Sequence, residues 1–76
     1  MKPSKIKQAR LTLGFTQQKI SGIMGIHIKL WQKWEQGSQG ISAAPAMFLR
    51  LILVLAKMGI LEKCLKRIEN DNTKKL

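Results

Sequence analysis

The chain has 76 residues, of which 45% are apolar, and 14 Lys and Arg residues against four Asp and Glu residues give it a net charge of +10. This length fits one domain that buries only about 60% of its unfolded surface, which leaves no room for a buried active site beside a core. The apolar content excludes a disordered chain, and the charge indicates a polyanionic partner, with a merely solvated basic surface as the alternative.

The first 61 residues contain nine basic residues and a single acid, Glu35. Cys64 is the only cysteine, so an internal disulfide is excluded and a reducing, cytoplasmic setting close to the nucleoid is expected. The first residues lack the apolar segment of a signal peptide. The longest apolar stretch, residues 46–56, is shorter than a membrane span of about 20 residues, and we interpret it as a buried helix.

Regularly spaced glycines and the absence of sustained period-2 alternation predict an all-α fold of five helices, the first four of which end near a glycine. The first helix is expected over residues 4–13 with Ser4 as its N-cap, and the second over residues 17–24 with Thr16 as its N-cap. Their inward-facing residues, at helical spacing, are Ile6, Ala9, Leu13, Ile20, Ile23 and Met24.

The third helix is expected over residues 28–36, after the three-residue turn Gly25-Ile26-His27. Two short helices joined by a glycine turn, the second of them basic, are typical of the helix-turn-helix motif. Any small helical bundle with short connections is the alternative.

The fourth helix is expected to begin after the N-cap Ser42 and to end at about Met58. The fifth is expected over residues 61–69, with one apolar stripe. The domain would then comprise residues 1–70, and residues 71–76 would form a polar, frayed tail.

The string LGFTQQKISGIMGIHIKLWQKWEQG, residues 13–37, resembles the lambda-repressor-like XRE family of helix-turn-helix proteins. Residues 41–52, ISAAPAMFLRLI, are similar to one branch, the small regulators and antitoxins of the HigA, MqsA and NadS type. The resemblance covers about residues 4–58 and implies a five-helix lambda-repressor-like fold. The residues that match the family at its spacing are Leu13-Gly14, Thr16-Gln17, Ile20, Gly25-Ile26 and Trp34-Glu35-Gln36-Gly37.

The sequence departs from the family pattern at several of its helix starts and turns. Lys19 stands where a glutamate often completes a capping box, and Ser21 replaces a small apolar alanine. His27 replaces the Ser or Thr that usually caps the recognition helix, which makes it a poor cap by expectation. The operator sequence therefore does not follow from the resemblance.

The third helix is expected to bury one side and to read DNA with the other. Trp31 is expected to pack inward with Ile26, and Trp34 is expected to be half-buried. The resemblance places the base-reading residues on the opposite side, and they are Ile28, Lys29, Gln32 and Lys33.

The chemistry of these four side chains suits base edges to different degrees. Glutamine can pair with adenine and lysine can donate to guanine, whereas Ile28 offers only contact with a thymine methyl group. Phosphate contact or solvation is the alternative for the two lysines.

The start of the second helix offers free N–H groups and a partial positive charge, which suit a phosphate. In the family, the glutamine that matches Gln17 touches the DNA backbone; an ordinary first-turn residue is the alternative. The expected phosphate contacts are Gln17, Gln18, Lys19, His27, Lys5 and Lys7.

The resemblance also implies an ion pair between Arg10 of the first helix and Glu35 of the third. A lone carboxylate on a phosphate-binding surface would weaken binding unless a cation of the chain neutralised it. An exposed, mobile Glu35 is the alternative.

Neither a metal site nor catalysis is expected. One histidine and one cysteine cannot build a zinc site, and the chain offers no nucleophile–base–acid set. No cofactor is implied by the resemblance.

One short recognition helix reads only a few base pairs, so a homodimer whose helices lie about 34 Å apart is expected. The fifth helix either closes the core or contributes to the dimer face. The candidate dimer contacts are Leu11, Leu61, Cys64, Leu65 and Ile68.

The sequence thus predicts a sequence-specific double-stranded DNA-binding regulator, an autorepressor that places its third helix in the major groove. The alternative is an antitoxin that binds a small toxin protein and autoregulates its operon. A third hypothesis is a cationic protein that binds membrane surfaces or nucleic acid without sequence preference. Five short helices separated by glycines suit a folded domain better than a peptide that lies on a lipid surface.

Overall fold

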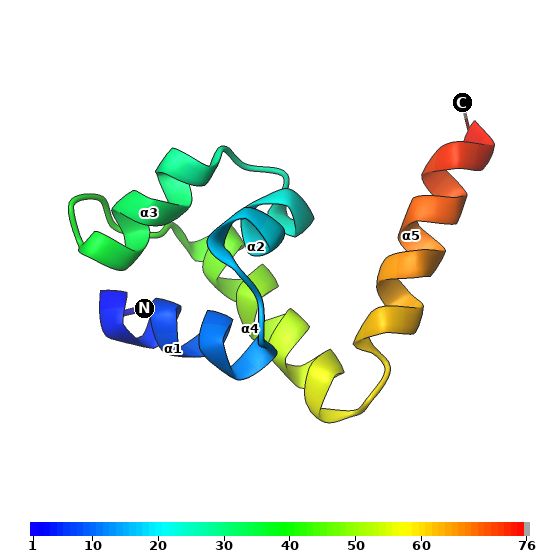
Figure 1. Ribbon diagram of the computed structural model, residues 1–76, viewed down its shortest axis with the longest axis horizontal. Helices are drawn as coiled ribbons and strands as arrows, with labels where there is room; N and C mark the ends of the chain where they lie inside the picture. Colours follow the sequence, from blue (N-terminus) through cyan, green and yellow to red (C-terminus); the bar gives the residue numbers. More distant parts are fainter. Residues whose placement is uncertain (76) are drawn as a thin grey trace.

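The computed structural model describes the backbone of residues 1–75 and the side chains of residues 1–71. This part of the chain forms five α-helices and no strand, which confirms the predicted all-α class. Figure 1 shows four helices gathered into one body and a fifth that leads away from it. The helices are α1 (Pro3–Leu13), α2 (Gln17–Met24), α3 (Ile28–Gln36), α4 (Ala43–Lys57) and α5 (Leu61–Lys75).

The first two helices begin in different ways. α1 begins at Pro3 with Lys2 as its N-cap, so the expected N-cap Ser4 is wrong by two residues. Proline suits the first position of a helix because the N–H that it lacks would have no partner there. At α2 the prediction is confirmed, since Thr16 Oγ1 accepts a hydrogen bond from the Lys19 N–H at 3.1 Å.

A tight turn joins α2 to α3. Gly25 adopts φ +69°, a left-handed conformation that favours glycine. Its N–H donates to the Gly22 carbonyl at 3.2 Å, and the Ile26 N–H donates to the Ser21 carbonyl at 3.0 Å. These bonds satisfy the last carbonyls of α2 and set the direction in which α3 starts.

The core lies where α1, α3 and α4 meet, with contributions from α2 and α5. Trp31 is fully buried, and Trp34 is 3% exposed rather than half-buried as expected. The two indoles lie three residues apart on one helix face, and their rings meet edge to face with centroids 5.9 Å apart. The other buried apolar side chains are Ile6, Ala9, Ile20, Ala46, Leu49, Ile52 and Leu61.

α4 is not the wholly buried helix that its sequence predicted. Ser42 is its N-cap, as expected, although the hydroxyl makes no capping hydrogen bond. One face packs into the core through Leu49 and Ile52. The opposite face remains open, and its residues are Met47 (60% exposed), Leu51 (52%), Val54 (51%) and Met58 (63%).

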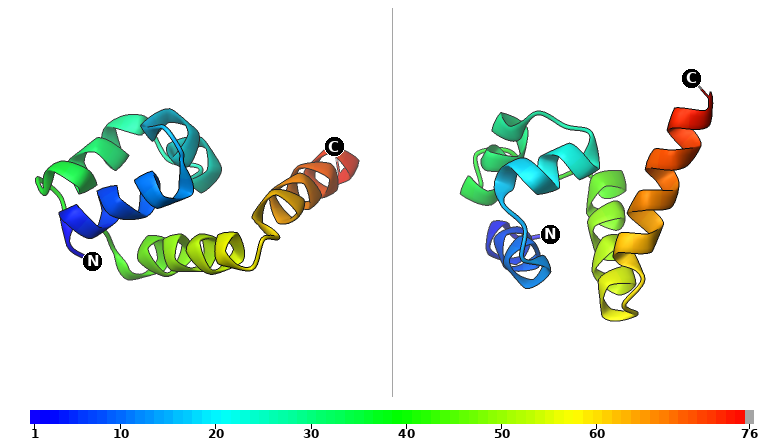
Figure 2. Two further views of the ribbon diagram at one scale, coloured as in Figure 1. Left: turned by 60° about the horizontal axis from the view of Figure 1, so that its bottom comes forward. Right: turned by 45° about the vertical axis from the view of Figure 1, so that its right-hand side comes forward.

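α5 continues to Lys75, past the end expected near residue 69. Residues 71–75, predicted as a frayed tail, contain no glycine or proline that would stop the helix; Leu76 of that tail lies outside the described residues. Figures 1 and 2 show α5 leaving the body of the molecule. The radius of gyration of 12.8 Å accordingly exceeds the value of about 11 Å typical of a compact chain of this length.

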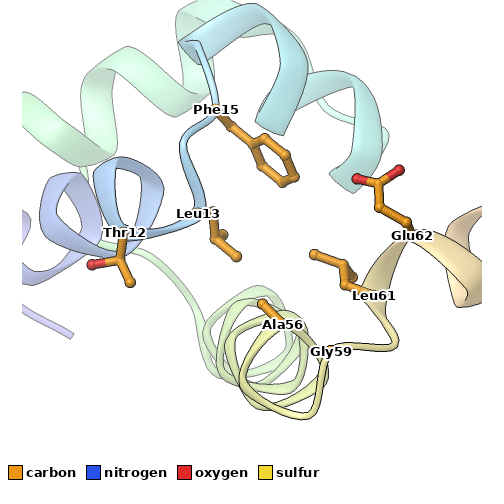
Figure 3. Close-up of a pocket in the computed structure, with 7 residues that line it drawn as sticks. All are labelled: Thr12, Leu13, Phe15, Ala56, Gly59, Leu61 and Glu62. Carbon is orange, nitrogen blue, oxygen red and sulfur yellow. The ribbon is translucent and has the colours of Figure 1, made fainter.

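The first turn of α5 is anchored in the core by Leu61, which is 7% exposed. Figure 3 shows this side chain facing Ala56 of α4, Leu13 at the end of α1 and Phe15 in the connection from α1 to α2. A shallow hollow of about 260 Å³ remains among these residues. Leu61, a predicted dimer contact, is therefore a core residue, because it closes the gap between α4 and the α1–α2 connection.

Candidate nucleic-acid interface

The four predicted base-reading residues all lie at the surface of α3. Lys29 and Lys33 are exposed, and Ile28 and Gln32 are partly buried. Trp31 faces the other way, into the core. The amphipathic arrangement that the sequence predicted is present: the indoles fix the helix, and its charged and amide side chains are left accessible.

Glu35 is the acceptor at the centre of a hydrogen-bond network beneath this surface. The predicted pair with Arg10 is present: Arg10 Nε lies 2.7 Å from Glu35 Oε2, and Arg10 Nη2 lies 3.2 Å from Oε1. Trp31 Nε1 also donates to Oε2, and Gln17 Nε2 donates to Oε1 at 3.2 Å. Arg10 Nη1 donates to the Phe15 carbonyl at 3.0 Å, so the guanidinium also holds the α1–α2 connection.

The network fixes the ionisation of Glu35. Burial raises the pKa of this carboxyl, but the hydrogen bonds from Arg10, Trp31 and Gln17 and the Arg10 charge outweigh that effect, so its pKa is lowered from 4.5. Only 6% of the Glu35 side chain and 12% of the Arg10 side chain are exposed. The carboxylate is thus neutralised within the fold and is kept away from any anion bound at the surface.

The network reaches the candidate base-reading face through two glutamines. Gln32 Nε2 donates to Gln17 Oε1 at 3.2 Å, and Gln17 in turn donates to Glu35. This link connects α3 to the first residue of α2. The sequence analysis missed it, because two amide side chains 15 residues apart carry no signal of contact in a sequence.

The expected phosphate contact of Gln17 stays a prediction, but its side chain is held between Glu35 and Gln32. The donors left at the start of α2 are the backbone N–H groups of Gln17 and Gln18, which make no hydrogen bond within the described residues. They are the groups that a phosphate at this helix end would meet.

His27 caps α3, contrary to the expectation of a poor cap. Its Nδ1 accepts a hydrogen bond from the Lys29 N–H at 3.1 Å. The imidazole nitrogen replaces the side-chain oxygen that Ser or Thr would supply, and so satisfies one free donor of the first turn. Ser21 is similarly satisfied, since its buried hydroxyl donates to the Gln18 carbonyl at 3.0 Å.

The exposed charges of residues 1–61 are all positive. Glu35 and Arg10 are withdrawn into their pair, and every other Lys and Arg side chain of this segment is exposed. Among them are the predicted phosphate contacts Lys5, Lys7 and Lys19. The full set is Lys2, Lys5, Lys7, Lys19, Lys29, Lys33, Arg50 and Lys57.

The remaining predicted dimer contacts divide into two groups. Leu11 and Ile68 are each 53% exposed and therefore available to a partner. Cys64 and Leu65 are partly buried, and Leu65 packs against the core. The apolar stripe of α5 thus begins inside the fold and becomes exposed along its length.

Within the described residues, no three His, Cys, Asp or Glu side chains gather as a metal site would require. None of the helices in residues 1–75 is both long and apolar enough to cross a membrane. Comparisons with protein-family models, curated proteins and solved structures give no match.

Proposed function

We propose that the protein is a sequence-specific, double-stranded DNA-binding regulator of the lambda-repressor-like helix-turn-helix type. In this proposal α3 enters the major groove and α2 lies across the phosphate backbone. Acting as a dimer, the protein represses transcription by occupying its own promoter.

The observation that carries the proposal is the combination of a cationic surface with a rigidly held reading helix. Residues 1–61 expose eight basic side chains and no acid. Such a surface suits a polyanion, and the affinity that it gives falls steeply with salt because counterions are released. Beneath this surface, α3 is anchored by hydrogen bonds to Arg10 of α1 and to Gln17 of α2.

That anchoring supports reading of bases rather than contact with phosphates alone. Glu35 ties α3 to Arg10 of α1 and to Gln17 of α2, and Gln32 is also bonded to Gln17. Side chains that discriminate bases must be held in a fixed register, because a bidentate hydrogen bond tolerates little displacement. Gln32 Oε1 makes no hydrogen bond within the described residues and faces no competing partner there.

Replacing Lys33 with alanine is expected to weaken binding to the preferred sequence by about 5- to 150-fold, the range of one good base contact. Binding to unrelated duplexes is expected to weaken much less. Fluorescence anisotropy with the region upstream of the gene and with a scrambled duplex measures both. Lys66→Ala, which removes an exposed lysine of α5, is the matched control. An equal loss on both duplexes would show that Lys33 contacts only phosphate.

A further inference from the structure

The exposed apolar face of α4 has the spacing of a helix-pairing seam. Met47, Leu51, Val54 and Met58 follow one another at intervals of four, three and four residues. Alternating steps of three and four keep one stripe of a helix turned toward a partner helix. Each of these side chains is more than half exposed. We call this set the α4 seam.

The α4 seam has a symmetry of its own. Met47 and Met58 lie equally far from the point between Ile52 and Leu53, and Leu51 and Val54 also lie symmetrically about that point. A two-fold axis through it would pair each residue with its mirror position on an antiparallel copy. Isologous contacts have this property, since residue i meets residue j and residue j meets residue i.

We propose that the α4 seam pairs with the α4 seam of a second copy of this chain. In the antiparallel register, Met47 packs against Met58 of the partner subunit, and Leu51 packs against Val54 of the partner subunit. Only the biological role of this dimer rests on the proposed function, because the pairing of two copies through the seam needs no DNA.

The α4 seam supplies the apolar centre of such a pair. The seam and Phe48, which is 37% exposed, make an apolar patch of roughly 400 Å², the size at which an exposed patch on a monomer is often functional. Two copies bury it twice, about 800 Å² of apolar surface, and the flanking residues extend the contact toward the 1,200–2,000 Å² of stable interfaces.

The two flanks of the α4 seam differ in charge. Arg50 and Lys57 are the only charged residues of the helix, and helical periodicity places both on the same flank of the seam. On the other flank lie Phe48 and Leu55, and Leu55 borders a groove with Cys64 and Ile68. The antiparallel register brings Phe48 of the partner subunit beside that groove, which Lys63 and Arg67 also line. The same symmetry brings Arg50 near Lys57 of the partner subunit on the other flank, a like-charge contact that salt should screen.

Sedimentation of the free protein tests the proposal. The wild type should dimerise in the micromolar range, and Leu51→Lys should raise the dissociation constant by about 100-fold or more, since the new charge enters a symmetric interface twice. Leu11→Lys is the matched control, because its side chain lies off the seam and is equally exposed, at 53% against 52%. Circular dichroism checks that each variant is folded, and Leu51→Gln is the milder substitution should the lysine disturb α4.

Cross-linking tests the register. In a Cys64→Ser background, a short thiol cross-linker should join two copies of the Met47→Cys, Met58→Cys double variant and neither of the single variants. A wild-type monomer throughout the micromolar range, or dissociation caused by Leu11→Lys and not by Leu51→Lys, would overturn the proposal.

Salt separates this inference from the proposed function. Each copy carries a net charge of +10, so screening should strengthen the dimer, whereas it should weaken DNA binding. A dimer that forms through the seam and ignores DNA would support the seam and remove the DNA proposal. A protein that stays monomeric and binds a half-site would support the DNA proposal and remove the proposed pairing of the seams.

Discussion

Replacing Glu35 with glutamine is expected to lower the free energy of unfolding by about 3–5 kcal/mol, the cost of breaking a buried pair from one side. Arg10, only 12% exposed, would lose its counter-charge. The new amide would also place donors where Trp31, Gln17 and Arg10 already donate. A domain of this length is stable by roughly 4–11 kcal/mol, so the variant should be close to unfolding at room temperature.

Thermal and denaturant unfolding measure this loss. Glu62→Gln, the same substitution at an exposed site in the first turn of α5, is the control and should cost less than about 1 kcal/mol. An unchanged melting temperature for Glu35→Gln would show that the network contributes nothing to stability.

Protonation of Glu35 at low pH should destabilise the wild type in the same way as the Glu35→Gln substitution. The pKa of Glu35 is lower in the folded chain than its ordinary value of 4.5, so the native state is stabilised in full above pH 4.5. That contribution is lost as the pH falls from there through the folded-state pKa. Melting temperatures of the wild type should therefore decline more steeply below pH 4.5 than those of Glu35→Gln; parallel profiles would contradict the assigned shift.

Replacing Trp31 with alanine is expected to cost about 3–5 kcal/mol from the lost side-chain volume alone. Trp31 is the largest fully buried side chain, and its indole N–H donates to Glu35. The variant should therefore be largely unfolded, as measured by circular dichroism and by the loss of amide protection.

A milder pair of substitutions separates the hydrogen bond from the volume. Trp31→Phe and Trp34→Phe remove similar volumes, but the buried Trp34 Nε1 has no hydrogen-bond partner within the described residues. Trp31→Phe should therefore be less stable than Trp34→Phe by about 1.5–3 kcal/mol, the value of a hydrogen bond to a charged group. If both variants lose the same free energy of unfolding, the hydrogen bond from the Trp31 indole to Glu35 adds nothing to stability.

The helix boundaries that the sequence predicted well are those set by local chemistry. A glycine follows each of the first three helices, and the Thr16 cap depends on atoms three residues apart. The Arg10–Glu35 pair, 25 residues apart, followed instead from the family resemblance. No local pattern in the chain would have identified it.

The features that were missed depend on how elements pack. Apolar content showed that α4 contacts a core, but it could not show that only one face is covered. Trp34 is buried in a cluster to which all five helices contribute, and no local pattern shows that closure. The His27 cap requires an imidazole orientation that points Nδ1 at the Lys29 N–H. The Gln17–Gln32 hydrogen bond requires a particular angle between α2 and α3.

The central claim, that α3 reads DNA, is tested most directly by selecting bound duplexes from a randomised pool with the wild type and with a Lys29→Ala, Lys33→Ala double variant. The wild type should enrich a short motif, its affinity for the motif should fall steeply with salt, and the double variant should lose the enrichment. Recovery of unenriched sequence by the wild type, or the same motif from both proteins, would contradict it.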